Sequence, residues 1–275
     1  MIKTITINGK SIGSGYLTQI GEVGGFEAPT VQNNTYYISG DHGAKTPNSY
    51  WRERNIILSL LVRANSLASF RLERDAIFKA FGIPSVGQST MSFTTNDNLL
   101  LQTDVQLVSM TGPFKSSYLG YELRIELIAS DPYLLGQTEN ETTVYLPTGS
   151  GTAIPTVIPL SLAYLTGGTE DITISGSGYF YPTITINGPV ENPIIKNYTT
   201  GKELQVEEVL TGNDHLAIDM KNQTVVLNNS LNYLDFTDGD FWRLAPGVNK
   251  VGLSSATYDV NASAVITWRN AYLGV

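Results

Sequence analysis

Few residues in this sequence could serve as nucleophiles or as acid–base groups. The chain has no cysteine and only two histidines, His42 and His215. A Ser-His-Asp triad needs one of these histidines beside an activated serine, and we expect no nucleophile elbow in this chain. The run Ser175-Gly176-Ser177-Gly178 has the composition of a turn. We therefore expect both histidines to be ordinary loop or surface residues, and we predict no catalytic residue and no enzyme.

Neighbouring carboxylates are the second signal that could indicate chemistry. Glu207 and Glu208 are adjacent, so on a strand they point to opposite faces and cannot converge on one glycosidic bond. Asp238 and Asp240 form the other candidate pair, in an acidic run that begins at Asp235. This run lacks the spacing and the terminal glutamate of a helix-flanked calcium loop. We predict a polar edge and a turn, with no metal or cofactor site; calcium binding at the run is the alternative.

Aromatic side chains are the third signal. The candidate rings lie in the second half of the chain, at Tyr179, Phe180, Tyr181, Tyr198, Tyr233 and Trp242. Exposed rings can stack on sugars, whereas most strand aromatics face a core, so core packing is the preferred interpretation. Tyr181 and Trp242 are the candidate glycan contacts under the alternative.

The stretch DFWRLAPGVNK, residues 240–250, places two large rings beside a sharp turn. Adjacent residues on a strand face opposite sides, so one ring anchors a core and the other does not. We predict that Phe241 is the inner one. Pro246-Gly247 then turns the chain into a further strand.

The composition is that of a folded protein. The 275 residues suffice for two domains, and 41% of them are hydrophobic while 15% are charged, unlike a disordered chain. No apolar run approaches the roughly 18 residues of a membrane helix, and the start MIKTITINGK alternates instead of forming a signal peptide. We expect synthesis in the cytoplasm and no membrane insertion. Without cysteine, stability depends on packing and on sheet pairing.

Period-two alternation dominates the chain and predicts strands. Residues 2–7 alternate and end in Asn8-Gly9, which suits a type I′ hairpin, and the same six letters recur at residues 183–188. The glycines at 21, 24 and 25 indicate a flexible loop. The exception to the alternation is residues 66–81, where apolar residues at helical spacing, with Ser66 as a candidate N-cap, predict one amphipathic helix.

A domain boundary is expected at Asp131-Pro132, because proline disfavours continuation of the preceding strand. Residues 1–131 hold 11 Lys+Arg and 11 Asp+Glu, and residues 132–275 hold 6 and 14, so that 6 − 14 = −8 places the whole net charge in the second half. An acidic half repels a phosphate backbone, and the arginines of the first half lack an interleaved aromatic-glycine motif. We expect no specific nucleic-acid binding.

Several motifs, in their order along the chain, resemble those of one protein family. In the first half they are Gly40-Asp41-His42-Gly43, the run from Tyr50 to Leu58, the helix from Arg74 to Phe81 and Asp131-Pro132-Tyr133. In the second half they are the segments 188–193 and 197–201, Asp240 to Leu244, Pro246 to Asn249 and a final strand at 264–272. Together they are similar to the distal tail proteins of long, flexible-tailed bacteriophages, which also occur in prophages and phage-tail-like bacteriocins.

The resemblance implies a mainly β fold with two domains. Residues 1–131 would be a ring-forming β-sandwich with the helix 66–81, and residues 132–275 a galectin-like β-sandwich. The function it implies is that of a structural hub at the tail tip of the virion: a homo-hexameric ring that joins the tail tube protein to the tip protein and to receptor-binding proteins. Asp41, His42, Gly43, Lys45, Tyr50 and Arg52 are the candidate ring or tube contacts. The rival function is a carbohydrate-binding adhesion module for host cell-wall glycan.

Overall fold

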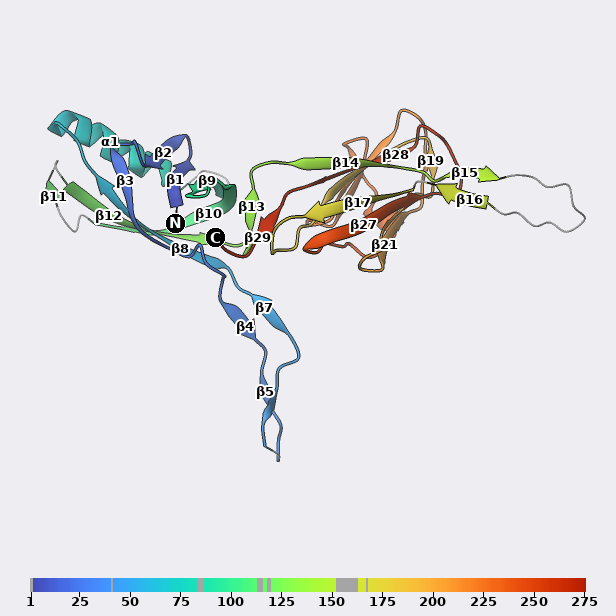
Figure 1. Ribbon diagram of the computed structural model, residues 1–275, viewed down its shortest axis with the longest axis horizontal. Coiled ribbons are helices and arrows are strands. Elements are labelled where there is room, and N and C mark those ends of the chain that lie inside the picture. Colours follow the sequence, from blue (N-terminus) through green and yellow to red (C-terminus); the bar gives the residue numbers. More distant parts are fainter. Residues whose placement is uncertain are drawn as a thin grey trace, which may run out of the picture. The chain divides into compact units, whose positions relative to one another are not determined.

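The computed structural model describes residues 2–40, 42–83, 87–112, 116–117, 120–151, 163–166 and 168–275. It divides into two compact units, which are considered separately: unit 1 is Met1–Gln137 with Tyr272–Val275, and unit 2 is Thr138–Ala271. The division thus follows Gln137, where the sequence suggested Asp131, and the last four residues return to unit 1. The mainly β architecture predicted from the sequence is confirmed (Figure 1).

Unit 1 is built on an antiparallel sheet in the strand order β2-β1-β9-β10-β12-β8-β3. Alternation explains the long strands, since every second side chain of β8 and of β12 is buried. The strands are β1(Ile2–Ile7), β2(Lys10–Gly13), β3(Thr18–Gly24), β8(Arg54–Val62), β9(Ser89–Thr95), β10(Leu100–Thr111), β11(Ser116–Ser117), β12(Gly120–Ala129) and β13(Leu134–Gly136).

Two predictions about this sheet have opposite outcomes. The β1–β2 hairpin turns at Asn8 and Gly9, both at positive φ, as predicted. The glycine-rich stretch 21–25 was expected to be a loop, and this is wrong: β3 runs to Gly24 and pairs with β8, with a register shift between Ile20 and Val23. A bulge accommodates the glycines within a strand, which the composition alone did not indicate.

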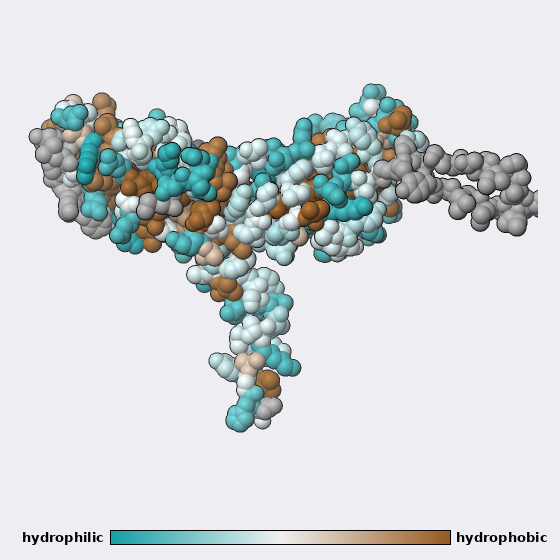
Figure 2. Space-filling view, viewed as in Figure 1, coloured by the Kyte–Doolittle hydropathy of each residue, from teal (hydrophilic) through white to brown (hydrophobic). Residues whose placement is uncertain are grey.

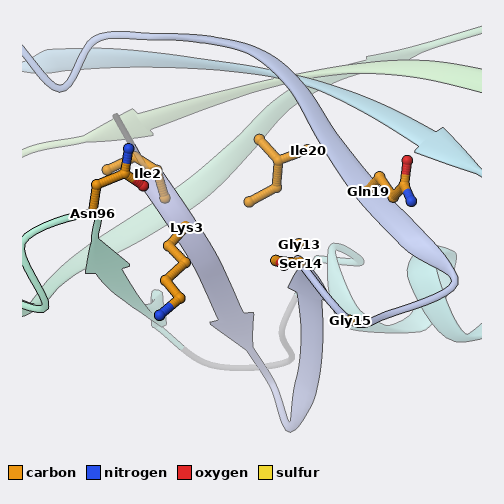
Figure 3. Close-up of a pocket in the computed structure, with 8 residues that line it drawn as sticks. All are labelled: Ile2, Lys3, Gly13, Ser14, Gly15, Gln19, Ile20 and Asn96. Atoms are coloured by element: carbon orange, nitrogen blue, oxygen red, sulfur yellow. The ribbon is translucent and has the colours of Figure 1, made fainter.

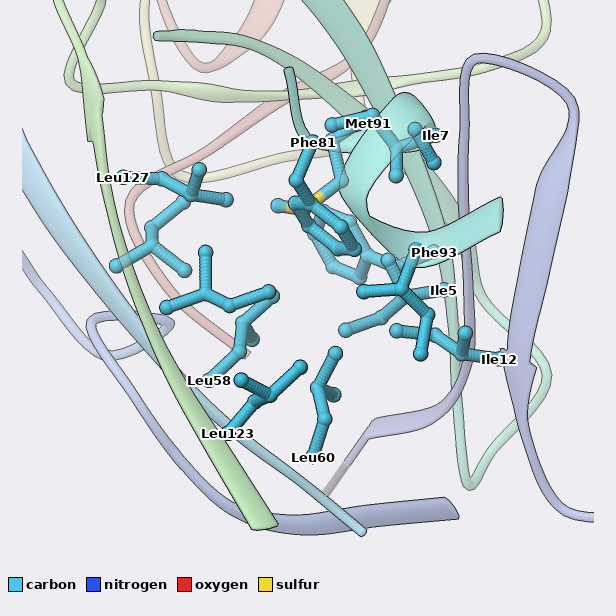
Figure 4. Packing of buried hydrophobic residues seen from close by; sticks show 14 of the residues in the cluster. Ile5, Ile7, Ile12, Leu58, Leu60, Phe81, Met91, Phe93, Leu123 and Leu127 are labelled. Atoms are coloured by element: carbon cyan, nitrogen blue, oxygen red, sulfur yellow. The ribbon is translucent and has the colours of Figure 1, made fainter. Parts of the chain in front are cut away.

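The single helix described in unit 1, α1(Leu67–Ala80), is tied to the sheet by packing and by a buried carboxylate. Ser66 caps it, since its Oγ accepts a hydrogen bond from the Ser69 amide at 3.2 Å. Glu73 is buried and accepts from Lys10 Nζ and Thr18 Oγ1, both at 2.6 Å. Figure 4 shows Phe81, just past the helix, against Met91 and Phe93 in the core of unit 1. No described helix has the length and apolarity to cross a membrane.

Unit 2 has two antiparallel sheets around a separate core. One has the order β14(Asn140–Tyr145), β28(Ser263–Trp268), β18(Thr183–Asn187), β23(His215–Asp219), β24(Thr224–Leu227), β25(Leu231–Asn232). The other has the order β17(Thr169–Ile174), β27(Gly247–Ser254), β20(Ile194–Asn197), β21(Lys202–Val206), β26(Thr237–Gly239). Two short ladders pair β15(Thr148–Gly151) with β16(Ala163–Thr166) and β19(Val190–Glu191) with β22(Val209–Leu210). A 3-10 turn, η1(Leu234–Phe236), completes the elements of unit 2. The last strand, β29(Ala271–Tyr272), pairs with β13 and so belongs to the sheet of unit 1.

The prediction that Phe241 is the inner ring is wrong. Trp242 is only 1% exposed and lies in the core of unit 2, while Phe241 is partly buried at its margin. Phe180 and Leu244 form a β-bridge, which determines which side chains of this segment face the core. Leu244 and Trp242, two residues apart, both lie on the inner side. The expected turn at Pro246-Gly247 is present, and β27 begins at Gly247.

Replacing Trp242 should therefore destabilise the chain more than replacing Phe241. We expect Trp242→Ala to leave a large cavity and to lower the free energy of unfolding of unit 2 by about 3–5 kcal/mol. Phe241→Ala, which removes a partly buried ring, should have a clearly smaller effect. Differential scanning calorimetry of both full-length variants checks this order, and equal effects would contradict the assignment.

Candidate functional site

A β-hairpin in unit 1, residues 30–52, carries only exposed side chains among its described residues. We call it the hairpin arm. Its strands are β4(Val31–Asn33), β5(Tyr36–Tyr37), β6(Ala44–Lys45) and β7(Ser49–Trp51), with β4 paired to β7 and β5 to β6 (Figure 1). The arm lies between β3 and β8, two paired neighbours in the sheet, so it is an extension of that strand connection.

Local polar contacts hold the arm together, since no core covers it. Ser49 Oγ donates to Asn33 Oδ1 at 2.7 Å, and the hydroxyls of Thr35 and Thr46 lie 2.9 Å apart. Near the tip, Gly43 has φ +100°, a conformation that favours glycine. An isolated two-stranded ribbon is marginal in water, so these contacts order the arm only weakly.

The arm exposes several large apolar or aromatic side chains. They are Val31, Tyr36, Tyr37, Ile38, Tyr50 and Trp51. Figure 2 shows hydrophobic and hydrophilic residues side by side along it. A two-stranded ribbon has no core in which these side chains could be buried. Exposed apolar surfaces of this kind mark protein–protein contacts.

The structure brings most of the predicted contact residues onto the arm. His42, Gly43 and Lys45 lie at or near its tip, whereas Tyr50 and Arg52 lie near its root. Asp41 lies outside the described residues. The sequence reasoning missed Tyr36, Tyr37 and Trp51 as contact candidates; the aromatic residues on both sides of the Gly40-to-Gly43 turn were the signal that could have identified them.

The root of the arm is fixed by a buried arginine, Arg54. Its Nη1 donates to the carbonyl oxygens of Gly25, at 2.7 Å, and of Glu27, and its Nη2 donates to those of Pro132 and Leu273, each at 2.7 Å. Burial lowers the pKa of Arg54, and the nearby carboxylates of Glu27 and Asp131 oppose that shift. The guanidinium remains a cation, so four carbonyl dipoles converge on one buried charge.

Gly25 makes this root possible. It has φ +88°, and a Cβ there would collide with the carbonyl oxygen of Asn55. Glycine therefore allows β3 to end against β8 while presenting its own carbonyl to Arg54.

The two candidate glycan contacts have different environments. Tyr181 is 38% exposed, but Trp242 lies in the core, so its ring cannot stack on a sugar. This corrects the prediction for Trp242. The nearby ring of Tyr179 has the guanidinium of Arg243 over it, 3.8 Å from the ring centroid.

Two of the carboxylates considered for chemistry have local partners. Glu208 accepts a hydrogen bond from the Val209 amide at 2.8 Å, and Asp240 lies 3.7 Å from Lys202 Nζ. In the described part of the chain, no three His, Cys, Asp or Glu side chains are placed to hold a metal ion.

An open hollow of about 530 Å³ lies in unit 1 (Figure 3). Its lining is Ile2, Lys3, Gly13, Ser14, Gly15, Gln19, Ile20 and Asn96. Lys3 is the one charged member of this lining, and its Nζ approaches Asn98 Oδ1 at 3.5 Å. A single ammonium without an acid–base partner offers no catalytic arrangement.

Comparison with known proteins shows a match of part of the chain to one family model and a fold shared with a solved structure. Residues 175–272 match the family described as "Siphovirus-type tail component, C-terminal domain". The structure of the Dit protein of phage SPP1 has the same fold: the TM-score is 0.68 and the identity 12%, over 98% of this chain and 98% of that one. The predicted resemblance to distal tail proteins is confirmed.

Two further similar structures are chains of the phage P2 baseplate in its activated conformation. With calcium the TM-score is 0.49, at 12% identity over 97% of this chain and 98% of that one; with strontium it is 0.46, at 12% identity over 96% of each. No curated protein matches the sequence.

Arg54→Lys should loosen the root of the arm. One ammonium cannot reach four carbonyls in three chain segments, so we expect a loss of about 3 kcal/mol in the free energy of unfolding. The amides of residues 272–275 should also exchange faster, because Val275 donates to the Phe26 carbonyl at 3.0 Å beside this cluster. Hydrogen-exchange mass spectrometry and denaturant unfolding check both effects. Arg63→Lys, at an exposed arginine, is the control; equal behaviour of the two variants would contradict the role of Arg54.

Proposed function

We propose that this chain is a non-enzymatic structural hub of a phage tail tip, in which six copies form a closed ring. The observation that carries the proposal is the hairpin arm, whose exposed apolar side chains need a partner surface. The match of residues 175–272 to a siphovirus-type tail component supports the setting. The similar SPP1 Dit protein is described as a paradigm of the hub adsorption apparatus in phages that infect Gram-positive bacteria.

A closed ring gives every arm an equivalent partner. In a cyclic assembly each copy presents the same two surfaces, so an arm that binds its neighbour leaves no arm uncovered. The charge distribution favours unit 1 as the part in mutual contact. Unit 1 holds all 11 Lys+Arg and 11 Asp+Glu of residues 1–131 and no others, so it is neutral, while unit 2 carries the net −8.

The role that follows for the ring is mechanical. It joins the last ring of the tail tube to the tail-tip protein, and it leaves an axial channel for the contents of the tail. Unit 2, acidic and therefore well solvated, lies outside the ring, where a receptor-binding protein can attach. The chain is made in the cytoplasm of the host bacterium and acts in the virion.

Native mass spectrometry tests the ring directly. We expect a species of roughly 180 kDa, six times the 29.9 kDa of one chain. The double substitution Tyr37→Ser with Tyr50→Ser should shift the protein to a folded monomer, because both side chains are exposed and contribute little to the stability of one chain.

The matched control replaces two exposed tyrosines of unit 2, Tyr145→Ser with Tyr198→Ser, and should leave the ring intact. A wild-type chain that stays monomeric at all concentrations would contradict self-assembly into a ring. A ring that survives the arm substitutions but not the control would place the contact elsewhere.

A further inference from the structure

Five connections of unit 2 begin at one end of its two sheets, and one of them runs from β14 to β17 and contains β15 and β16. We call the other four together the loop end and define it as residues 188–193, 207–214, 228–236 and 255–262. The registers place it there: Asn187 lies opposite both His215 and Ser263, and Leu216 lies opposite Leu227. In the second sheet, Ile194 lies opposite both Gln205 and Ser254.

Hydrogen bonds join these connections to one another. Glu191 O accepts from Ser255 Oγ at 2.7 Å, which links the first connection to the last. Asn192 N donates to Glu208 O at 2.8 Å, and Glu207 N donates to Phe236 O at 2.8 Å. The loop end is therefore one continuous surface made of separate chain segments.

This surface exposes a group of large apolar side chains. They are Val209, Leu231, Leu234, Phe236, Tyr258 and Val260. Phe236 is held by a ring contact with Tyr233, at 5.1 Å between centroids. Tyr233 is itself packed against the core of unit 2. Part of the apolar surface is thus anchored to the core, unlike the free apolar residues of the hairpin arm.

The same surface is uniformly acidic. Its four connections contain six carboxylates, at Glu191, Glu207, Glu208, Asp214, Asp235 and Asp259, and no lysine or arginine. Hydrogen bonds from Thr211 and Asn228 lower the pKa of Asp214, so this group is charged at neutral pH. Apolar side chains interspersed with charges of one sign favour a partner that supplies both apolar contact and the opposite charge.

We propose that the loop end is a docking surface for a second protein, one that presents lysine or arginine among apolar side chains. The inference rests on the proposed function, because it takes that partner from the same tail tip. Nucleic acids, anionic membranes and anionic wall polymers carry the wrong charge for this surface. A neutral glycan would leave its many carboxylates and aliphatic side chains unmatched.

The probes are three synthetic peptides of equal length, titrated calorimetrically into the full-length protein. One alternates lysine and leucine, one lysine and serine, and one glutamate and leucine. We expect the Lys-Leu peptide to bind most tightly, since it alone supplies both charge and apolar contact. Phe236→Ser with Tyr258→Ser should weaken that binding roughly tenfold. Glu207→Gln with Asp235→Asn should weaken it and reduce its dependence on salt.

The control is Tyr198→Ser with Val248→Ser, elsewhere on unit 2. These side chains are 50% and 58% exposed, against 53% for Phe236 and 54% for Tyr258, so the two double variants remove comparable surface. Equal loss in both variants, equal binding of the Lys-Leu and Lys-Ser peptides, or no binding of the Lys-Leu peptide would overturn the inference. Native mass spectrometry of the same samples reports the ring separately, so failure of docking is distinguishable from failure of the hub proposal.

Discussion

The buried guanidinium of Arg54 is the constraint on which unit 1 depends. Its four carbonyl acceptors come from three places: residues 25–27, where the chain enters the hairpin arm, Pro132, shortly before it leaves for unit 2, and Leu273, just after it returns. Loss of any of these four carbonyls would leave part of a buried cation without a partner, so all three places are fixed together. Arginine suits this position because its planar head donates in several directions at once, which the single ammonium of lysine cannot do.

Local patterns in the sequence predicted local structure well. Alternation indicated β1, β8 and β12, and the helix followed from apolar spacing and the cap at Ser66, because each signal depends on neighbours within a few residues. The return of the last four residues to unit 1 could not be predicted in this way, since it depends on contacts across most of the chain. Arg54 lies in a charged run with Arg52 and Glu53, and nothing local distinguishes the buried arginine from the exposed one.

The alternating pattern of the sequence also leaves open which of two neighbouring side chains faces the core. The pattern required that Phe241 and Trp242 face opposite sides, but only the bridge between Phe180 and Leu244 decides which ring enters the core. On the arm, the motifs of the resemblance indicated contact residues only among positions 41–52. Residues 35–39 were expected to be a strand, but its pairing with the segment that holds Lys45 is what places Tyr36 and Tyr37 beside those contacts. A single sequence indicates which residues form strands better than it indicates which strands pair.

The two units divide the electrostatic requirements of an assembly between them. Copies of a unit 1 without net charge can approach closely without strong mutual repulsion, which suits contact through a surface such as that of the arm, where apolar side chains lie beside Lys45 and Arg52. Copies of an acidic unit 2 repel one another, although salt limits this repulsion to roughly 8 Å under physiological conditions. In a ring of the proposed kind, self-association is therefore favoured in unit 1 and opposed in unit 2. The acidic loop ends of neighbouring copies then do not bind one another, and each can bind a basic partner. The difference in net charge between the two units therefore favours both closure of the ring and selection of that partner.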